Sequence, residues 1–175
     1  MRIIAGRWRG HRLNPVKGRG VRPTTDRVRE AWMSAVGFGL EEARVLDLFA
    51  GSGALGLEAL SRGASSAVFV ERSRGALRTL RKNIETLGAE ADSQVIAGDA
   101  MAYLNRLGSE DFDLAFADPP YEKGLAGKLL EAFEKKGFAR ELWVEHRSSE
   151  TMPAFPGLRQ RRYGDTTLST LSRIE

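Results

Sequence analysis

One tetrapeptide in this sequence, Asp118-Pro119-Pro120-Tyr121, has residue types that suit the binding of a planar amino group. Its two prolines hold the backbone rigid and remove two backbone N–H groups. The polar surface is therefore mostly acceptor, made of the Asp118 carboxylate and the Pro119 carbonyl. Two acceptors match the two donor hydrogens of an amine, and the Tyr121 ring can stack on a base. A simple turn is the alternative, but the apolar stretch directly before it favours a binding corner.

The same residues could also activate such an amine. An aromatic amine is a poor nucleophile because its lone pair is delocalised into the ring. Hydrogen bonds to Asp118 and Pro119 would localise that pair on the nitrogen, and a methyl donor placed in line could then react with it. Asp118 could stabilise the cationic amine that forms and accept its proton. We therefore assign Asp118, Pro119 and Tyr121 as candidate catalytic residues.

A glycine-rich run extends from Asp47 to Gly56, after an apolar stretch and at the start of an expected helix. Its three glycines match the dinucleotide-binding fingerprint, and Glu71 lies 20 residues after Gly51, at the place of the ribose-binding acid. By this motif alone, a nicotinamide-dependent enzyme remains an alternative, and so does a purely structural tight turn.

Three carboxylates favour a different ligand. Asp47, Glu71 and Asp99 each lie at the carboxyl end of an expected strand, where open α/β sheets bind their ligands. S-adenosylmethionine carries a sulfonium, an ammonium group, ribose hydroxyls and an amino group, all of which suit carboxylates, whereas a pyrophosphate would be repelled. Helix capping is the alternative for Asp47 and Asp99. The candidate cofactor-binding residues are Asp47, Phe49, Gly51, Gly53, Glu71, Arg72, Asp99 and Ala100.

The positive charge of the chain is concentrated near its beginning. Residues 1–29 contain eight arginines and one lysine against the single acid Asp26, a local net charge of +8 within a total of +4. Such a segment suits phosphate binding, although a solvated basic tail is the alternative. Apolar residues are interleaved with the charges, which favours a folded surface; they are Ile3, Ile4, Trp8, Leu13, Val16 and Val21.

The periodicity of apolar residues predicts the elements that must position these groups. Residues 2–13 are typical of a β-hairpin with a turn near Arg9-Gly10, and a helix follows Pro23 with Thr25 or Asp26 as its N-cap. Strands are then expected at 44–49, 67–70, 93–97, 113–117 and 142–145, alternating with helices at 54–61, 73–87, 99–107 and 125–133. Strands at 159–163 and 167–174 would form a closing antiparallel hairpin. The alternation predicts an α/β fold with a mostly parallel sheet covered on both faces.

Composition excludes several function classes. The chain of 175 residues has no cysteine and two histidines, which excludes thiol nucleophiles and iron–sulfur ligation and gives no support to a metal site. No apolar run approaches a membrane span of about 18 residues, and no signal-peptide core is seen at the N-terminus. We therefore expect a cytoplasmic protein without membrane or metal partners. We also expect a single methyltransferase domain over 1–175, with a basic hairpin and loop at 1–23 and a catalytic core at 24–175.

Four runs together resemble the bacterial 16S ribosomal RNA (guanine-N2)-methyltransferases of the RsmD type. They are Arg22 to Ala31, Asp47 to Gly63, Asp118 to Tyr121 and Tyr163 to Thr166, and the likeness covers nearly the whole chain. The glycine run and Asp-Pro-Pro-Tyr are shared with other amino-methyltransferases, including DNA adenine-N6 enzymes. The Arg-Pro-Thr segment and the basic N-terminal hairpin are more specific to this family.

The resemblance implies a Rossmann-like, doubly wound sheet of seven strands with an antiparallel last strand. It implies S-adenosylmethionine as the methyl donor and one guanine of 16S ribosomal RNA as the acceptor, in an assembled or partly assembled 30S subunit. Glu71 would hold the ribose, Asp99 the adenine edge, and Asp118 to Tyr121 the target base. The basic hairpin and loop would contact RNA, and the candidate RNA-binding residues are Arg7, Arg9, Arg12, Arg22, Pro23 and Thr24.

Three alternatives to this function remain open at the level of sequence. An amino-methyltransferase could act on another RNA or on adenine N6 in DNA. A protein glutamine methyltransferase uses a similar proline-rich motif, but that class usually has Asn where Asp118 stands and has less use for a basic arm. An RNA-binding protein with a degenerate cofactor site is the third, and the presence of Asp47, Glu71 and Asp118 counts against it.

Overall fold

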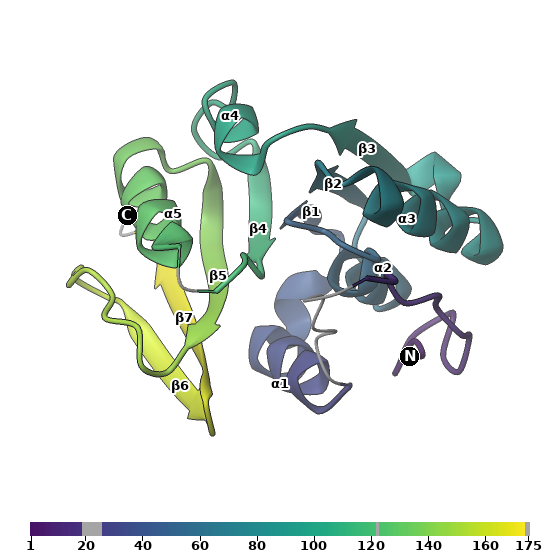
Figure 1. Ribbon diagram of the computed structural model, residues 1–175, viewed down its shortest axis with the longest axis horizontal. Helices are drawn as coiled ribbons and strands as arrows, with labels where there is room; N and C mark the ends of the chain where they lie inside the picture. Colours follow the sequence, from purple (N-terminus) through teal and green to yellow (C-terminus); the bar gives the residue numbers. More distant parts are fainter. Residues whose placement is uncertain (19–25, 122, 174–175) are drawn as a thin grey trace.

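A computed structural model of the chain describes residues 1–18, 26–121 and 123–173 (Figure 1). The α-helices are α1 (Asp26–Val36), α2 (Ala54–Ser61), α3 (Arg74–Leu87), α4 (Ala100–Leu104) and α5 (Leu125–Lys136), with short 3₁₀ helices at Gly37–Leu40 and Glu90–Asp92. The strands are β1 (Arg44–Leu48), β2 (Ser66–Glu71), β3 (Ser93–Ala97), β4 (Phe112–Ala117), β5 (Ala139–Arg147), β6 (Arg159–Tyr163) and β7 (Thr166–Ser172). The predictions for Arg22, Pro23, Thr24 and Thr25 fall outside the described residues.

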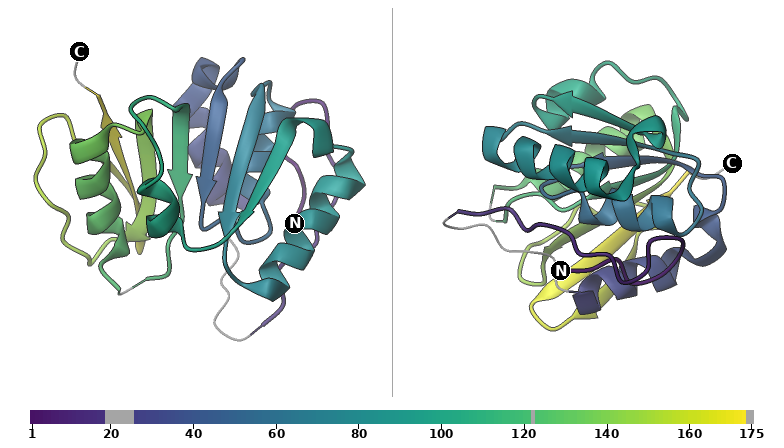
Figure 2. Two further views of the ribbon diagram at one scale, coloured as in Figure 1. Left: turned by 90° about the horizontal axis from the view of Figure 1, so that it is seen from above. Right: turned by 90° about the vertical axis from the view of Figure 1, so that its right-hand side faces the viewer.

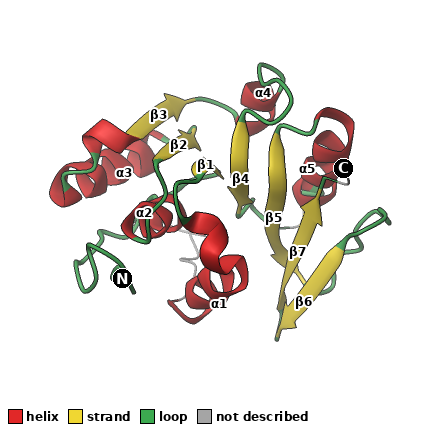
Figure 3. Cartoon of the chain, turned by 180° about the vertical axis from the view of Figure 1, so that it is seen from behind, coloured by secondary structure: helices red, strands yellow, loops and turns green. Residues whose placement is uncertain are grey.

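All seven strands form one sheet in the order β3-β2-β1-β4-β5-β7-β6. The first five strands in this order pair in parallel, and β7 lies antiparallel between β5 and β6. Figure 3 shows β3 and β6 at opposite edges of the sheet. The prediction of a Rossmann-like, mostly parallel sheet with a closing antiparallel hairpin is therefore confirmed. The parallel strands bring their carboxyl ends to one edge, where the predicted site residues follow them.

Helices cover both faces of the sheet, as the two views of Figure 2 show. Side chains alternate along each strand, so Val45 of β1 packs in the cluster beneath α1, α2 and α3, while Leu46 packs in the cluster beneath α4 and α5. Trp32 of α1 makes an edge-to-face contact with Phe116 of β4, with ring centroids 5.5 Å apart. This burial on both faces explains why the central strands are short apolar runs.

Two helices begin where the sequence predicts an N-cap. The Ser73 hydroxyl accepts a hydrogen bond from Ala76 N at the start of α3, and Asp99 accepts one from Ala102 N at the start of α4. The apolar face of α3 faces the core, as its helical spacing indicates. In contrast, α4 ends at Leu104, three residues before the predicted end at 107, because the last residues before Gly108 form a turn instead of continuing the helix.

The N-terminal segment, residues 1–18, forms less regular structure than predicted. The expected β-hairpin is reduced to one antiparallel bridge between Arg2 and Arg12, with hydrogen bonds from Ile3 N to His11 O and from Gly10 N to Ile3 O. Ile3 and Leu13 are buried and anchor the segment to the core. The segment is thus folded against the sheet domain mainly by packing and by contacts with side chains of other elements.

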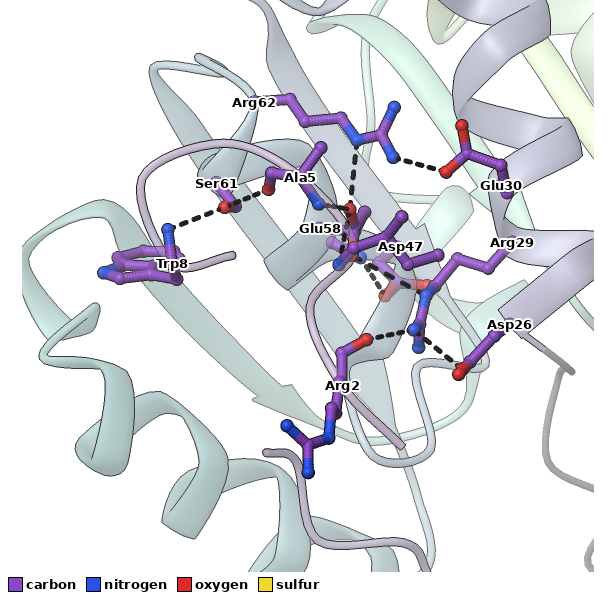
Figure 4. Close-up of polar contacts among 12 residues, drawn as sticks. Arg2, Ala5, Trp8, Asp26, Arg29, Glu30, Asp47, Glu58, Ser61 and Arg62 are labelled. Carbon is purple, nitrogen blue, oxygen red and sulfur yellow. Dashed lines mark hydrogen bonds and ion pairs between the residues drawn. The ribbon is translucent and has the colours of Figure 1, made fainter. Parts of the chain in front are cut away.

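Glu58 of α2 provides the main polar attachment for this segment (Figure 4). Its fully buried carboxylate accepts hydrogen bonds from Ile4 N and Ala5 N at 3.0–3.1 Å. It also pairs with Arg62 Nε at 3.0 Å and lies 3.6 Å from Arg29 Nε. Burial lowers the pKa of Arg29, and the charge of Glu58 opposes that shift. The Glu58 carboxylate thus binds two backbone N–H groups and, together with Asp26 at 3.0 Å, compensates a buried cation.

The approach of the segment to α2 also requires a glycine. Gly6 has φ +86°, and a Cβ atom on it would lie 1.9 Å from the carbonyl oxygen of Ser61. This close contact lets Arg7 N donate to Ser61 O, while the Ser61 hydroxyl donates to Ala5 O and accepts from Trp8 N. The C-terminal turn of α2 is therefore the surface on which the segment lies.

We expect Glu58→Gln to lower the free energy of unfolding by about 3 kcal/mol, because it removes the buried anionic partner of the buried Arg29 cation. Asp26 also pairs with Arg29, at 3.0 Å, but its side chain is 62% exposed. The matched control is Glu30→Gln, since Glu30 also binds Arg62, at 2.9 Å, but its side chain is about half exposed. That control should cost less than about 1 kcal/mol. Urea unfolding of both variants measures the difference, and equal costs would show that Glu58 is not the anchor described above.

Candidate active site

One cavity of about 760 Å³ lies at the carboxyl edge of the parallel strands. Most of the predicted cofactor-binding and catalytic residues line this cavity, namely Asp47, Phe49, Gly51, Glu71, Arg72, Asp99, Ala100, Asp118, Pro119 and Tyr121. Pro120 also lines it. The structure therefore brings the glycine turn and the Asp118–Tyr121 corner to one pocket. Its volume lies in the range of small-molecule sites, which is about 300–1,000 Å³.

The glycine turn between β1 and α2 is held by the carboxylate at the end of β2. Glu71 Oε2 accepts a hydrogen bond from Gly51 N at 2.8 Å. Its other oxygen accepts from Arg72 N and Ser73 N, both at 2.9 Å. Because a carboxylate offers about four acceptor positions, these bonds leave capacity for a ligand hydroxyl. Phe49 has φ +58°, an uncommon conformation for a residue with a side chain, and such strain concentrates at functional sites.

Asp47 is buried in β1 and ties this strand to α2. Its carboxylate accepts a hydrogen bond from Gly56 N at 3.0 Å, in the first turn of the helix. Burial raises the pKa of Asp47 well above its ordinary value, the bond from Gly56 lowers it, and the nearby charges of Asp118 and Glu71 raise it further. The capping alternative for Asp47 thus describes part of its role, although its side chain also lines the cavity.

The other two glycines of the fingerprint serve packing. Gly53 is outside the cavity lining, and a Cβ atom on it would lie 2.4 Å from Leu80 Cδ1. A Cβ atom on Gly56 would lie 2.4 Å from the Phe69 ring of β2. Both glycines allow α2 to approach the neighbouring elements closely. The structure therefore gives Gly53 an indirect role, since it shapes the turn whose residue Gly51 faces the cavity.

Arg72 and Asp99 line the cavity from the loops that follow β2 and β3. Asp99 Oδ1 caps α4, and its Oδ2 lies 3.9 Å from a guanidinium nitrogen of Arg72. The side chain of Asp99 is half exposed. One oxygen thus meets the structural need for a cap, while the other lies near the Arg72 cation.

The Asp118–Tyr121 corner follows β4, and its tyrosine is held by two other strands. Tyr121 donates its hydroxyl hydrogen to Glu145 Oε1 of β5 at 3.2 Å and lies 3.4 Å from Thr166 Oγ1 of β7. The Arg147 guanidinium lies over the Tyr121 ring, 5.2 Å from its centroid. These contacts fix the ring at the cavity wall. Asp118 is half-buried beside it, and Pro119 is buried.

The predicted RNA-binding arginines of the described chain lie outside the cavity. Arg7 pairs with Asp92 at 3.1 Å and stacks on the Trp8 ring, 4.1 Å from its centroid. Arg9 and Arg12 are exposed. Arg7 therefore differs from Arg9 and Arg12 in its availability for phosphate binding. Asp92 compensates part of its charge, and its guanidinium covers the Trp8 ring.

Sequence reasoning missed several residues of this site. Glu145 and Arg147 line the cavity from the end of β5, and Met1, Pro15 and Val16 line it from the N-terminal segment. The sequence offered one signal for Glu145, an acid at the carboxyl end of an apolar strand. The contribution of the N-terminal segment had no signal, because it depends on long-range docking against α2.

Two kinds of feature are absent from the described residues. No helix among them is both long and apolar enough to cross a membrane. No group of three or more potential metal-ligating side chains occurs in the described ranges.

The strand order, the antiparallel last hairpin and the cavity at the carboxyl edge define a Rossmann-like protein of the methyltransferase fold class. The family described as "Conserved hypothetical protein 95" matches residues 1–172, and the chain belongs to this family, the RsmD family. The resemblance drawn from the sequence motifs is thereby confirmed.

Named relatives and solved structures agree with this assignment. The chain is 40% identical over 162 residues to ribosomal RNA small subunit methyltransferase D of Escherichia coli K12, covering 89% of this chain and 79% of that protein. The solved structure of the yhhF methyltransferase of Escherichia coli has a TM-score of 0.84 at 38% identity and covers 99% of this chain and 97% of that one. An RNA methyltransferase of Salinibacter ruber, solved with S-adenosyl-L-homocysteine, shares the fold with a TM-score of 0.65 at 16% identity, over 86% of this chain and 93% of that one.

We expect Asp47→Asn to gain stability relative to the wild type as the pH rises. The raised pKa of Asp47 means that its contribution to stability is full below the unfolded-state pKa of about 3.9 and is lost as the pH rises through the folded-state value. Asparagine does not titrate, so the free energy of unfolding of the variant minus that of the wild type should increase as the pH rises above the unfolded-state value of about 3.9. A difference that does not change with pH would contradict the assigned burial effect.

Proposed function

We propose that this chain transfers a methyl group from S-adenosylmethionine to the exocyclic N2 amine of a guanine in small-subunit (16S) ribosomal RNA. The observation that carries this proposal is the shared cavity, in which the Asp118–Tyr121 corner and the glycine turn line one space of about 760 Å³. A donor bound at the turn and an amine bound at the corner would then be neighbours. Proximity of this kind contributes on the order of 7–11 kcal/mol to a reaction between two molecules.

The residues around the cavity fit S-adenosylmethionine. Glu71 holds the turn and retains acceptor capacity toward the cavity, which suits ribose hydroxyls. Asp99 has one oxygen outside its capping bond, which suits the adenine edge. Among the described residues, apart from the chain neighbours of Gly51, no heavy atom lies within 4 Å of where its Cβ would be, so a ligand can approach the backbone there. When bound, this cofactor supplies a methyl group on a sulfonium sulfur.

The chain's own residues would bind and activate the amine. The Asp118 carboxylate and the Pro119 carbonyl accept the two amine hydrogens, so the nitrogen lone pair becomes available to an incoming methyl group. Asp118 then stabilises the positive nitrogen and takes up its proton. The contacts of Tyr121 with Glu145, Thr166 and Arg147 hold its ring at the wall, where a base can stack on it.

The RNA substrate is supported by charge and by relatives. The N-terminal segment carries the exposed cations Arg9 and Arg12 on a folded surface, which suits phosphate contacts. The Escherichia coli relative is named for methylation of small-subunit ribosomal RNA. A guanine must leave its stack to reach the cavity, at a cost of a few kcal/mol that is smallest in loops. A 30S subunit, assembled or partly assembled, is accordingly the substrate that we propose, and a bacterial cytoplasm the place of action.

We expect Asp118→Ala to abolish methyl transfer while binding of S-adenosylhomocysteine persists within about threefold, because the residue acts on the amine and not on the cofactor. Turnover is measured as transfer of labelled methyl to 30S subunits, and binding by calorimetry. Asp165→Ala, an exposed acid in the turn between β6 and β7, is the control and should retain wild-type turnover. Normal turnover by Asp118→Ala would refute the assigned chemistry.

The substrate assignment has its own test. Purified protein is incubated with 30S subunits, with naked 16S RNA and with duplex DNA, and modified nucleosides are identified by mass spectrometry. We expect N2-methylguanosine in the small-subunit samples. Methylation of adenine N6 in the DNA sample instead would support the alternative function, that of a DNA adenine-N6 methyltransferase.

We expect Arg9→Gln with Arg12→Gln to weaken RNA binding and to flatten its salt dependence. In a plot of log K against log salt, the slope should fall by about 0.7–0.9 for each phosphate that the protein no longer neutralises. The control is Lys135→Gln at the C-terminal end of α5, an exposed cation outside the cavity lining, and it should leave the slope unchanged. An identical slope for the double variant and the wild type would mean that these arginines do not face RNA.

A further inference from the structure

The N-terminal segment forms part of the candidate cofactor site. Met1, Pro15 and Val16 line the same cavity as Gly51 and Glu71, although the segment lies outside the sheet. The cations of this segment at positions 9 and 12 are exposed and do not line the cavity. The segment therefore has two surfaces. Its outer surface is basic, and its inner surface forms part of the cavity wall.

One buried side chain joins this wall to the glycine turn. Asn83 of α3 is fully buried, and its Oδ1 accepts a hydrogen bond from Asn14 N at 2.8 Å. Its Nδ2 donates to Asn14 O at 3.0 Å and to Ser52 O at 2.9 Å. Asn14 directly precedes the wall residues Pro15 and Val16, and Ser52 directly follows Gly51 in the turn. The two parts of the cavity wall thus share one amide group.

These three hydrogen bonds need both the donor and the acceptor groups of an amide side chain. Both amide hydrogens of Asn83 are used, one on each of two carbonyl oxygens, and the amide oxygen receives a backbone N–H. An apolar side chain at position 83 would leave three backbone groups, Asn14 N, Asn14 O and Ser52 O, without this partner. An aspartate would place a negative oxygen against two carbonyl oxygens. Asn83 otherwise lies among the apolar residues of α3, such as Leu80 and Leu87, where packing alone would not select an amide.

We propose that Asn83 is a positioning residue through which binding of RNA to the N-terminal segment strengthens binding of the cofactor at the glycine turn. This inference rests on the proposed function, because it requires that RNA contacts the segment. RNA bound to the segment also restrains its inner wall at Pro15 and Val16, and Asn83 transmits that restraint to Ser52. By linkage, the cofactor must strengthen RNA binding by the same factor. The enzyme would therefore retain its cofactor most tightly when its substrate is present.

The test measures the dissociation constant of S-adenosylhomocysteine by equilibrium dialysis, with and without saturating 30S subunits, for the wild type and for Asn83→Asp. We expect the subunits to tighten binding to the wild type by about fivefold or more, a typical allosteric coupling. For Asn83→Asp we expect less than about a twofold effect. The matched control is Leu87→Ala, which weakens the packing of the same helix without touching Asn14 or Ser52, and it should keep the wild-type ratio.

A second variant tests the same coupling from the other side, in case Asn83→Asp does not fold. Gly6→Ala forces a Cβ atom against Ser61 O and so displaces the segment from α2, while Asn83 and Ser52 stay unchanged. It should also reduce the ratio below about twofold at saturating subunits. Circular dichroism establishes that each variant measured is folded.

The outcomes separate the two proposals. A wild-type ratio near one, or an unchanged ratio in folded Asn83→Asp or Gly6→Ala, would overturn the coupling while cofactor binding itself stands. A loss of coupling in Leu87→Ala equal to that in Asn83→Asp would also overturn it, because general loosening of α3 would then explain the effect. Failure of the wild type to bind S-adenosylhomocysteine under either condition would instead refute the proposed function, and the coupling with it.

Discussion

Carboxylates that bind backbone N–H groups hold this molecule's functional edge in place. Glu71 binds the glycine turn through Gly51 N, and Asp47 binds the start of α2 through Gly56 N. Glycines in a turn give the backbone freedom that would be costly in a binding site unless something restrains them. A carboxyl group restrains such a turn because each hydrogen bond that it accepts fixes the position of one backbone N–H group. The shape of the cavity depends on these two side chains before any ligand arrives.

A carboxylate that binds backbone N–H groups also attaches the N-terminal segment. Glu58 binds Ile4 N and Ala5 N and is itself neutralised by Arg29 and Arg62, so that a basic segment is held by a buried acid. The attachment leaves the exposed cations of the segment on its outer surface and brings its later residues to the cavity. Charge is thus divided in space, with anions inside the core and at the cavity wall, and cations outside where phosphates can reach them.

The fold was largely predictable because its signals are local. Apolar runs at β1 and β4, the cap at Ser73 and the acceptor-rich corner at Asp118 each arise from a few neighbouring residues, and the parallel topology follows from their alternation. The N-terminal segment was less predictable. The sequence predicts a regular hairpin there, but contacts with Glu58, Ser61 and Asn83 supply the hydrogen-bond partners that a second strand would otherwise provide.

The sequence by itself determined where the candidate ligand site lies and which residue types line it. The types and order of Asp47, Gly51, Glu71 and Asp118 select a cavity with acceptor groups at the carboxyl edge of a parallel sheet, since strand ends in a βαβ succession must meet there. Only the tertiary structure decided which remote residues complete that cavity. Glu145 and the segment through Val16 join it, and Asn83 links two of its walls, through contacts between residues far apart in the chain. Such contacts depend on how β5 pairs in the sheet and on how α2 and α3 pack, and no local pattern of residues encodes them.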